Sequence, residues 1–321
     1  MIFSPALKKA SQLCLKSACL AAACFNFMAS ELSAATNEGA TSSESAPKSP
    51  FERVVDSLCT ANAKYVSINN ARTQKSDIDT RIGFKQWQVS LGSLDLKDQD
   101  GSVRSLINVG VKSSYLQWRQ SPYFRTSQQH NAFIEGAHHF DLDLPVELHA
   151  HAHFETDLQA RQLCKYSMAT VTLWGSKNYN DVDYSLGLYK ELGRHSQTLL
   201  PVLGVHTKIY ENFDLDILLP FHAKVAYNLC DPCSIYAGVK TLKERQRSQP
   251  APVNSKTIWQ YRANIAHLGA SYNYEKIAQG SFELGRALSP TVRVFDAEGH
   301  HLITQRVRSS LFAELSLNVF F

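Results

Sequence analysis

Three histidines at alternate positions are the residues of this chain whose spacing best suits chemistry: His149, His151 and His153. Side chains two positions apart on a β-strand share one face, so the three rings emerge together, and the opposite face carries Leu148, Ala150, Ala152 and Phe154. Neighbouring rings on one face lie roughly 6.5–7 Å apart, which lets two imidazoles bind one metal ion. The alternative is that the histidines line a wet interior. We predict that the histidines line the interior and bind no metal. His138 and His139 lie on the preceding strand candidate, and the register between the two strands decides which of them faces the same side as His149, His151 and His153.

No hydrolytic pattern accompanies these histidines. A serine and a histidine that work together on one strand face stand two residues apart, so that the imidazole can take the hydroxyl proton. None of the 12 histidines has a serine two positions after it, and His195 and Ser196 are adjacent and would point to opposite faces. The acidic residues that a protease would pair with a histidine stand in no distinctive motif: Asp141, Asp143, Asp181 and Asp183. We therefore predict no enzyme, no catalytic residue and no cofactor.

Two cysteines, Cys230 and Cys233, enclose an Asp-Pro pair that favours a tight turn. They are candidates for a disulfide, with free thiols, intermolecular cross-linking and redox chemistry as alternatives. A thioredoxin-like pair would need a surrounding βαβ pattern, and a zinc site would need a second cysteine pair. Neither is visible. Beyond the first 35 residues the chain also holds Cys59 and Cys164, and an even number of cysteines permits disulfides in an oxidising compartment.

The N-terminal segment has the pattern of an export signal. Lys8, Lys9 and Lys16 precede a short apolar core, and Ser33-Ala34-Ala35 offers small residues for cleavage. We predict a cleaved signal peptide over residues 1–35 and a flexible linker with a short helix over 36–60, because Ser, Ala, Thr, Glu and Pro dominate it. A formal net charge of +4 is too small to predict nucleic-acid binding.

From about residue 62 onward the hydrophobic period is two, which is typical of β-strands. The segments that predict strands are 63–71, 82–96, 105–117, 132–142, 146–155, 166–175, 183–191, 201–210, 214–219, 222–229, 234–242, 258–275, 279–287 and 310–321. At roughly 20 residues per strand and connection, residues 61–321 hold about thirteen strands, and an even number closes a barrel. We predict twelve strands, within a range of ten to fourteen.

The last strand carries a second signal. Apolar residues at every second position lead to the final aromatic residue: Leu315, Leu317, Val319 and Phe321. This ending resembles the assembly signal of Gram-negative outer-membrane β-barrels. The layout of residues 199–239, with Pro201 opening one strand and Pro220 closing another, is similar to a family of uncharacterised outer-membrane barrel proteins of Gram-negative bacteria, chlamydiae among them.

The resemblance implies a closed antiparallel transmembrane β-barrel over residues 61–321, with outer-membrane lipid and the barrel-assembly machinery as partners. We expect tight turns at 211–213 and 229–233, long polar loops at 242–256 and 292–309, and His149, His151 and His153 facing the lumen. We also expect aromatic girdles at the strand ends. Their candidate members are Trp87, Tyr115, Trp118, Tyr123, Phe124, Trp174, Tyr210, Trp259, Tyr261 and Tyr272.

The sequence thus predicts an exported outer-membrane protein that passes small solutes or has a structural surface role. The first alternative is a periplasmic β-sandwich or lipocalin-like binding protein, and the second is an outer-membrane enzyme. An outer-membrane barrel and a periplasmic domain differ in where the apolar side chains lie, because a membrane barrel turns them outward and a soluble domain turns them inward.

Overall fold

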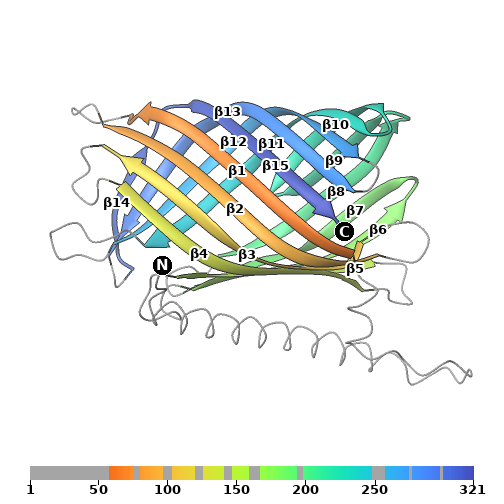
Figure 1. Cartoon of the computed structure of the whole chain (residues 1–321), viewed down its shortest axis with the longest axis horizontal. Helices are drawn as coiled ribbons and strands as arrows, with labels where there is room; N and C mark the ends of the chain where they lie inside the picture. The colour runs from red at the N-terminus through yellow and green to blue at the C-terminus, as the bar shows by residue number, and fades with distance from the viewer. Residues whose placement is uncertain are drawn as a thin grey trace, which may run out of the picture.

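The computed structural model is a closed antiparallel β-barrel (Figure 1). It describes residues 58–74, 80–96, 103–119, 126–140, 147–158, 167–193, 198–247, 257–274, 277–296 and 299–321. The predicted signal peptide and nearly all of the predicted linker lie outside these residues, and the barrel begins at Leu58, three residues before the predicted boundary. Among the described residues there is no helix with the length and apolar character that a membrane crossing demands.

The strands follow one another around the wall. The first seven are β1 (Leu58–Arg72), β2 (Arg81–Leu96), β3 (Val103–Trp118), β4 (Thr126–Phe140), β5 (Glu147–Asp157), β6 (Met168–Tyr179) and β7 (Val182–Gly193). The remaining eight are β8 (Leu199–Tyr210), β9 (Phe213–Leu219), β10 (His222–Cys230), β11 (Cys233–Arg247), β12 (Ile258–Tyr274), β13 (Ala278–Phe295), β14 (His301–Arg306) and β15 (Ser310–Phe320).

Closure occurs where the last strand meets the first. β15 pairs with β1 on one side and with β13 on the other, and β13 pairs with β12. β14 continues the line of β15 along the far part of β13, so the two together form one interrupted strand of a fourteen-stranded barrel. Fourteen is the upper end of the predicted range and two more than the predicted twelve. At roughly 20 residues per strand and connection, the estimate of about thirteen strands lies between these two even numbers.

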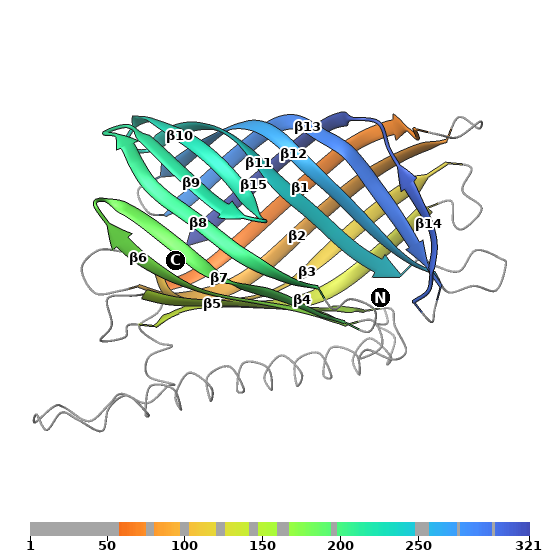
Figure 2. The same ribbon diagram turned by 180° about the vertical axis from the view of Figure 1, so that it is seen from behind.

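The connections differ between the two rims. We call the rim that holds Leu58 and Phe321 the termini rim; there β6 and β7, β8 and β9, and β10 and β11 are each joined by two residues. Asn180 and Asp181 form the first of these turns with φ of 52° and 62°, the left-handed conformation that a tight hairpin with two central residues requires. The far rim has a two-residue turn between β9 and β10 (Figure 2), and its connections β1–β2, β3–β4, β5–β6 and β11–β12 each span seven to ten residues.

A belt of apolar side chains surrounds the part of the wall next to the termini rim. On β12, Leu268 points outward with 68% of its surface exposed, and its outward neighbours on adjacent strands are also apolar. We call these outward positions the apolar belt; its exposed members include Tyr65, Trp87, Val89, Leu91, Val109, Val111, Val171, Leu173, Leu186, Leu188, Leu203, Val225, Ile235, Val239, Leu268, Phe282, Leu284, Leu315 and Leu317. A soluble β-sandwich would bury these residues, so the predicted sandwich alternative is wrong.

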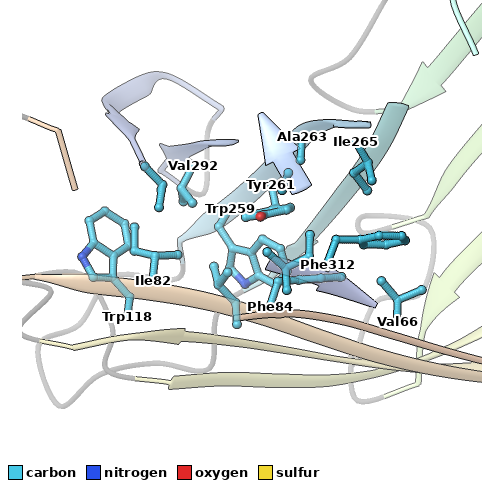
Figure 3. Close-up of a cluster of buried hydrophobic side chains, with 14 of the residues drawn as sticks. Val66, Ile82, Phe84, Trp118, Trp259, Tyr261, Ala263, Ile265, Val292 and Phe312 are labelled. Carbon is cyan, nitrogen blue, oxygen red and sulfur yellow. The ribbon is translucent and has the colours of Figure 1, made fainter. Parts of the chain in front are cut away.

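The long strands continue past the belt, and in this part the outward side chains are polar and the inward side chains are apolar. We call this part the extension; it consists of the far-rim ends of β1–β3 and β11–β13 together with β14 and the start of β15. Its outward positions are exposed and polar: Arg81, Lys85, Arg262, Asn264, Arg293, Thr304 and Arg306. Its inward positions form one buried apolar cluster (Figure 3): Val66, Ile68, Ile82, Phe84, Leu116, Trp118, Trp259, Tyr261, Ala263, Ile265, Ala287, Val292, Val294, Val307 and Phe312. The extension is therefore built like a soluble domain, whereas the belt is built for an apolar solvent.

This reversal corrects two sequence predictions. The segments expected as long polar loops are strands in part, since β11 runs to Arg247, β13 runs to Phe295, and β14 lies within residues 292–309. Residues 248–256 lie outside the described residues. Three predicted girdle residues, Trp118, Trp259 and Tyr261, belong to the interior cluster and are at most 3% exposed. Trp87, Tyr210 and Tyr272 do point outward, with 43%, 73% and 50% of their surfaces exposed. Tyr123 and Phe124 lie outside the described residues.

Candidate functional site

The inner wall of the barrel carries the histidines. β5 alternates so that Ala150, Ala152 and Phe154 face outward, and His149, His151 and His153 face the interior. The side chains of the three histidines remain 22–31% exposed, so water reaches them. Their placement results from strict alternation on an unbroken strand.

The three rings have separate partners. His151 lies 2.8 Å from a carboxylate oxygen of Glu135 on β4. His153 lies 3.4 Å from Glu155 and stacks on Phe133. His149 instead meets His139, whose Nδ1 lies 3.2 Å from the Nδ1 of His149. The neighbouring histidines of β5, which the sequence suggested as chelating pairs, therefore turn towards different groups: His139 and Glu135 on β4, and Glu155 on β5 itself.

Sequence reasoning missed one neighbour of His149. Nε2 of His149 lies 2.9 Å from the hydroxyl of Ser176 on β6, and its ring stacks on Trp174 with centroids 5.2 Å apart. A serine two positions along the same strand is what the sequence lacks, whereas this contact crosses from β5 to β6. The signal that would have found it is the β5–β6 register, which pairs Glu147 with Ser176 and His149 with Trp174.

An ionic group joins opposite walls of the barrel. Lys112 on β3 forms a salt bridge with Glu155 and reaches Glu244 on β11 at 3.1 Å, although β3 and β11 are far apart in the sheet order. All three side chains are at least 91% buried. Asn131 donates a further hydrogen bond of 2.9 Å to Glu155. We call Lys112, Glu155 and Glu244 the cross-lumen triad.

Next to it, apolar contacts also cross the lumen. Phe84 on β2 stacks on Tyr261 on β12, with centroids 5.0 Å apart and planes 8° apart. Trp259 on β12 donates a hydrogen bond of 3.0 Å to the hydroxyl of Ser127 on β4. The wall formed by β1–β4 is thus held against the wall formed by β11–β13, and the interior is filled on this side.

The opposite sector of the interior is wetter. Inward from β9 and β10, His222 lies 3.0 Å from Asp216, and Lys224 lies 4.0 Å from the same carboxylate. These side chains are 33–40% exposed. The described inner wall from β5 to β10 therefore presents ionisable groups to water, which a filled core does not.

The other sequence-predicted residues occupy the termini rim. Leu315, Leu317 and Phe321 point outward with 55%, 47% and 68% of their surfaces exposed. Cys230 and Cys233 pair directly beside the two-residue turn of the β10–β11 hairpin as free thiols, so the structure contains no disulfide between them. Cys164 lies outside the described residues, as do Asp141 and Asp143.

Comparisons with known proteins give solved structures of low similarity only. No protein-family model matches the chain, and no curated protein matches it. Among solved structures, an outer membrane channel from Pseudomonas putida F1 is 9% identical, with 86% of this chain and all of that chain covered and a TM-score of 0.45. The translocator domain of the autotransporter NalP from Neisseria meningitidis is 9% identical, with 95% and 98% covered and a TM-score of 0.41. The KdgM porin is 8% identical, with 82% and 99% covered and a TM-score of 0.32. Similarities of this size carry no argument about the activity of this chain.

Proposed function

We propose that this chain is an outer-membrane β-barrel that lets small polar solutes pass along the wet inner wall between β5 and β10. The observation that supports this most strongly is the pairing of the apolar belt outside with half-exposed ionisable groups inside. Hydrocarbon offers no hydrogen bonds to the backbone, so a sheet that crosses it must close on itself, as this one does.

The dimensions of the barrel support a membrane location. A strand tilted by about 45° needs about 9–11 residues to cross the hydrocarbon. β7 and β8 have 12 residues each, and β10 has 9. β1–β3, with 15–16 residues, exceed this length, and their surplus lies in the extension. The apolar belt would therefore meet lipid, and the extension would stand in water beyond it.

Export and assembly follow as further parts of the proposal. A cleaved signal peptide over residues 1–35 would carry the chain across the inner membrane, and the barrel-assembly machinery would recognise Leu315, Leu317, Val319 and Phe321. The outward direction of these side chains along β15 supports their role, because an assembly factor can reach them before β15 pairs with β1.

Planar-bilayer recordings on refolded protein test the proposed passage. We expect discrete conductance steps, and we expect the ion selectivity of the channel to depend on the charged inward side chains of β9 and β10. Lys224→Glu should shift the reversal potential towards cation selectivity, and Asp216→Lys should shift it towards anions, because both groups stand in the proposed path. Lys85→Glu makes the same charge change on the outer face of the extension and serves as the control.

Two results would refute the passage. One is the absence of conductance at every voltage in protein that migrates as a folded, heat-modifiable barrel. The other is a selectivity that responds equally to Lys224→Glu and Lys85→Glu. Either result would favour the structural surface role, which the apolar filling of the extension also suits.

A further inference from the structure

We propose that His139, Glu147 and His149 bind a divalent transition-metal ion at the termini rim, where β4 ends and β5 begins. One ligand atom from each residue lies within 4.8 Å of the other two. Two imidazoles and one carboxylate are a ligand set that zinc and its neighbours in the first transition row prefer. The proposed site goes beyond the passage of solutes and does not depend on it.

The distance between the two imidazoles fits such an ion. Nδ1 of His139 and Nδ1 of His149 lie 3.2 Å apart. Two nitrogens bound to one tetrahedral zinc ion at about 2.05 Å each are separated by roughly 3.3 Å. The rings cross edge to face, with an interplanar angle of 84° and centroids 4.3 Å apart. The separation of the two nitrogens therefore already matches that of two imidazoles that bind one ion.

Glu147 can complete the set. One of its carboxylate oxygens lies 3.7 Å from the Nε2 of His139 and 3.8 Å from the Nε2 of His149. Its side chain is 62% exposed, so it can swing towards the ion at little cost. The exposure also leaves room for a water molecule as a fourth ligand, as in zinc sites with three protein ligands.

The surroundings fix the two rings in place. Ser176 lies 2.9 Å from the Nε2 of His149, and an Nε2–H that donates to this hydroxyl leaves the Nδ1 lone pair directed at the proposed ion. A hydrogen bond from the second ring nitrogen is the usual support of a metal-bound histidine. Trp174 stacks on the same ring with an interplanar angle of 7°, and the side chain of His139 is 92% buried. These contacts hold the ligands in position before the ion arrives.

The same Ser176–His149 contact argues less well for a hydrolase. A serine nucleophile needs a histidine whose Nδ1–H is held by a carboxylate or amide oxygen. Here the Nδ1 of His149 faces a nitrogen of His139. The arrangement suits two imidazoles that share an ion, and the ion would tie β4 to β5 at the rim.

Metal titration of the refolded full-length barrel tests the site. We expect one Co²⁺ ion per chain, with absorption bands typical of low coordination number and displacement by Zn²⁺ but not by excess Mg²⁺, because imidazole is a poor ligand for Mg²⁺. His139→Ala and His149→Ala should each weaken binding at least about tenfold. Glu147→Gln should weaken it less. His138→Ala is the matched control, because His138 neighbours His139 but lies on the outward-facing positions of β4 beside Phe140.

A second measurement needs no change to the ligands. Paramagnetic Co²⁺ at this site should quench the fluorescence of Trp174, and Trp174→Phe should remove that quenching and leave the stoichiometry at one. The proposal is overturned if wild-type protein shows no saturable binding, if His138→Ala weakens binding as much as His139→Ala, or if the quenching persists in Trp174→Phe. Heat-modifiable migration of every variant shows that the barrel has folded.

Discussion

Replacing Lys112 with methionine should destabilise the barrel strongly, because it removes the ammonium group that Glu155 and Glu244 share. The carboxylates are 3% and 9% exposed, so water cannot replace the lost ammonium group. Glu155 keeps a hydrogen bond from Asn131, whereas Glu244 loses contacts of 3.1 and 3.3 Å to Lys112. Breaking a buried ion pair from one side costs about 3–5 kcal/mol, and we expect Lys112→Met to fall in that range.

Equilibrium unfolding in phospholipid vesicles measures this loss. The double variant Lys112→Met/Glu244→Gln should regain most of the stability, since it removes the carboxylate left without compensation. Lys64→Met is the control: Lys64 is 36% exposed, and its partner Glu314 keeps Lys240 at 2.9 Å, so the cost should be below about 1 kcal/mol. The reasoning would be refuted if Lys112→Met and Lys64→Met lost similar amounts, or if the double variant were less stable than Lys112→Met.

Two further predictions concern the belt and the extension. Leu268→Arg should cost about 2–4 kcal/mol in vesicles, because in the proposed membrane location its side chain would meet lipid. Asn264→Arg on the same face of β12 should cost below about 1 kcal/mol, and equal costs in the same unfolding assay would contradict the belt. Phe84→Ala should cost about 3–5 kcal/mol because Phe84 is fully buried and stacked on Tyr261, a value that chemical denaturation can measure against the outward variant Lys85→Ala; a cost no larger than that of Lys85→Ala would mean that the extension is not packed.

Most of the strands could be predicted from the alternation of apolar and polar residues, because this alternation has a period of two whether the apolar face points outward or inward. Each of the fourteen predicted segments overlaps a strand of the structure, from 63–71 on β1 to 310–321 on β15. The extension escaped prediction for a physical reason. The exposed positions of β13 and β14 are polar on both sides of the turn that joins these strands. Residues 292–309 therefore have the composition of a loop, although β13 and β14 pair there.

The orientation of single aromatic residues was harder to predict. Trp87 and Trp259 are both large and lie on alternating strands, yet Trp87 is 43% exposed and Trp259 is fully buried. What separates them is whether their part of the strand lies in the belt or in the extension, and alternation by itself does not reveal where the boundary falls. The sequence therefore predicted girdles that include members of the interior cluster.

The candidate metal cluster shows a second limit. That His149 shares a face with His151 and His153 follows from β5 alone, but its contacts with His139 and Ser176 depend on how β5 pairs with β4 and β6. A shift of one residue would turn His138 inward in place of His139. Only the register brings the ligands together, and one sequence does not fix the register.

Spin-label depth along β12 tests the central claim most directly, namely that the apolar belt lies in lipid while the extension stands in water. Single nitroxides at positions 262, 264, 268 and 270 would be placed in a background with the native cysteines replaced by serine, and the barrel would be refolded into bilayers. We expect labels at 268 and 270 to be accessible to oxygen and shielded from a polar nickel reagent, and labels at 262 and 264 to show the reverse. Equal access of the polar reagent to all four positions would contradict the account.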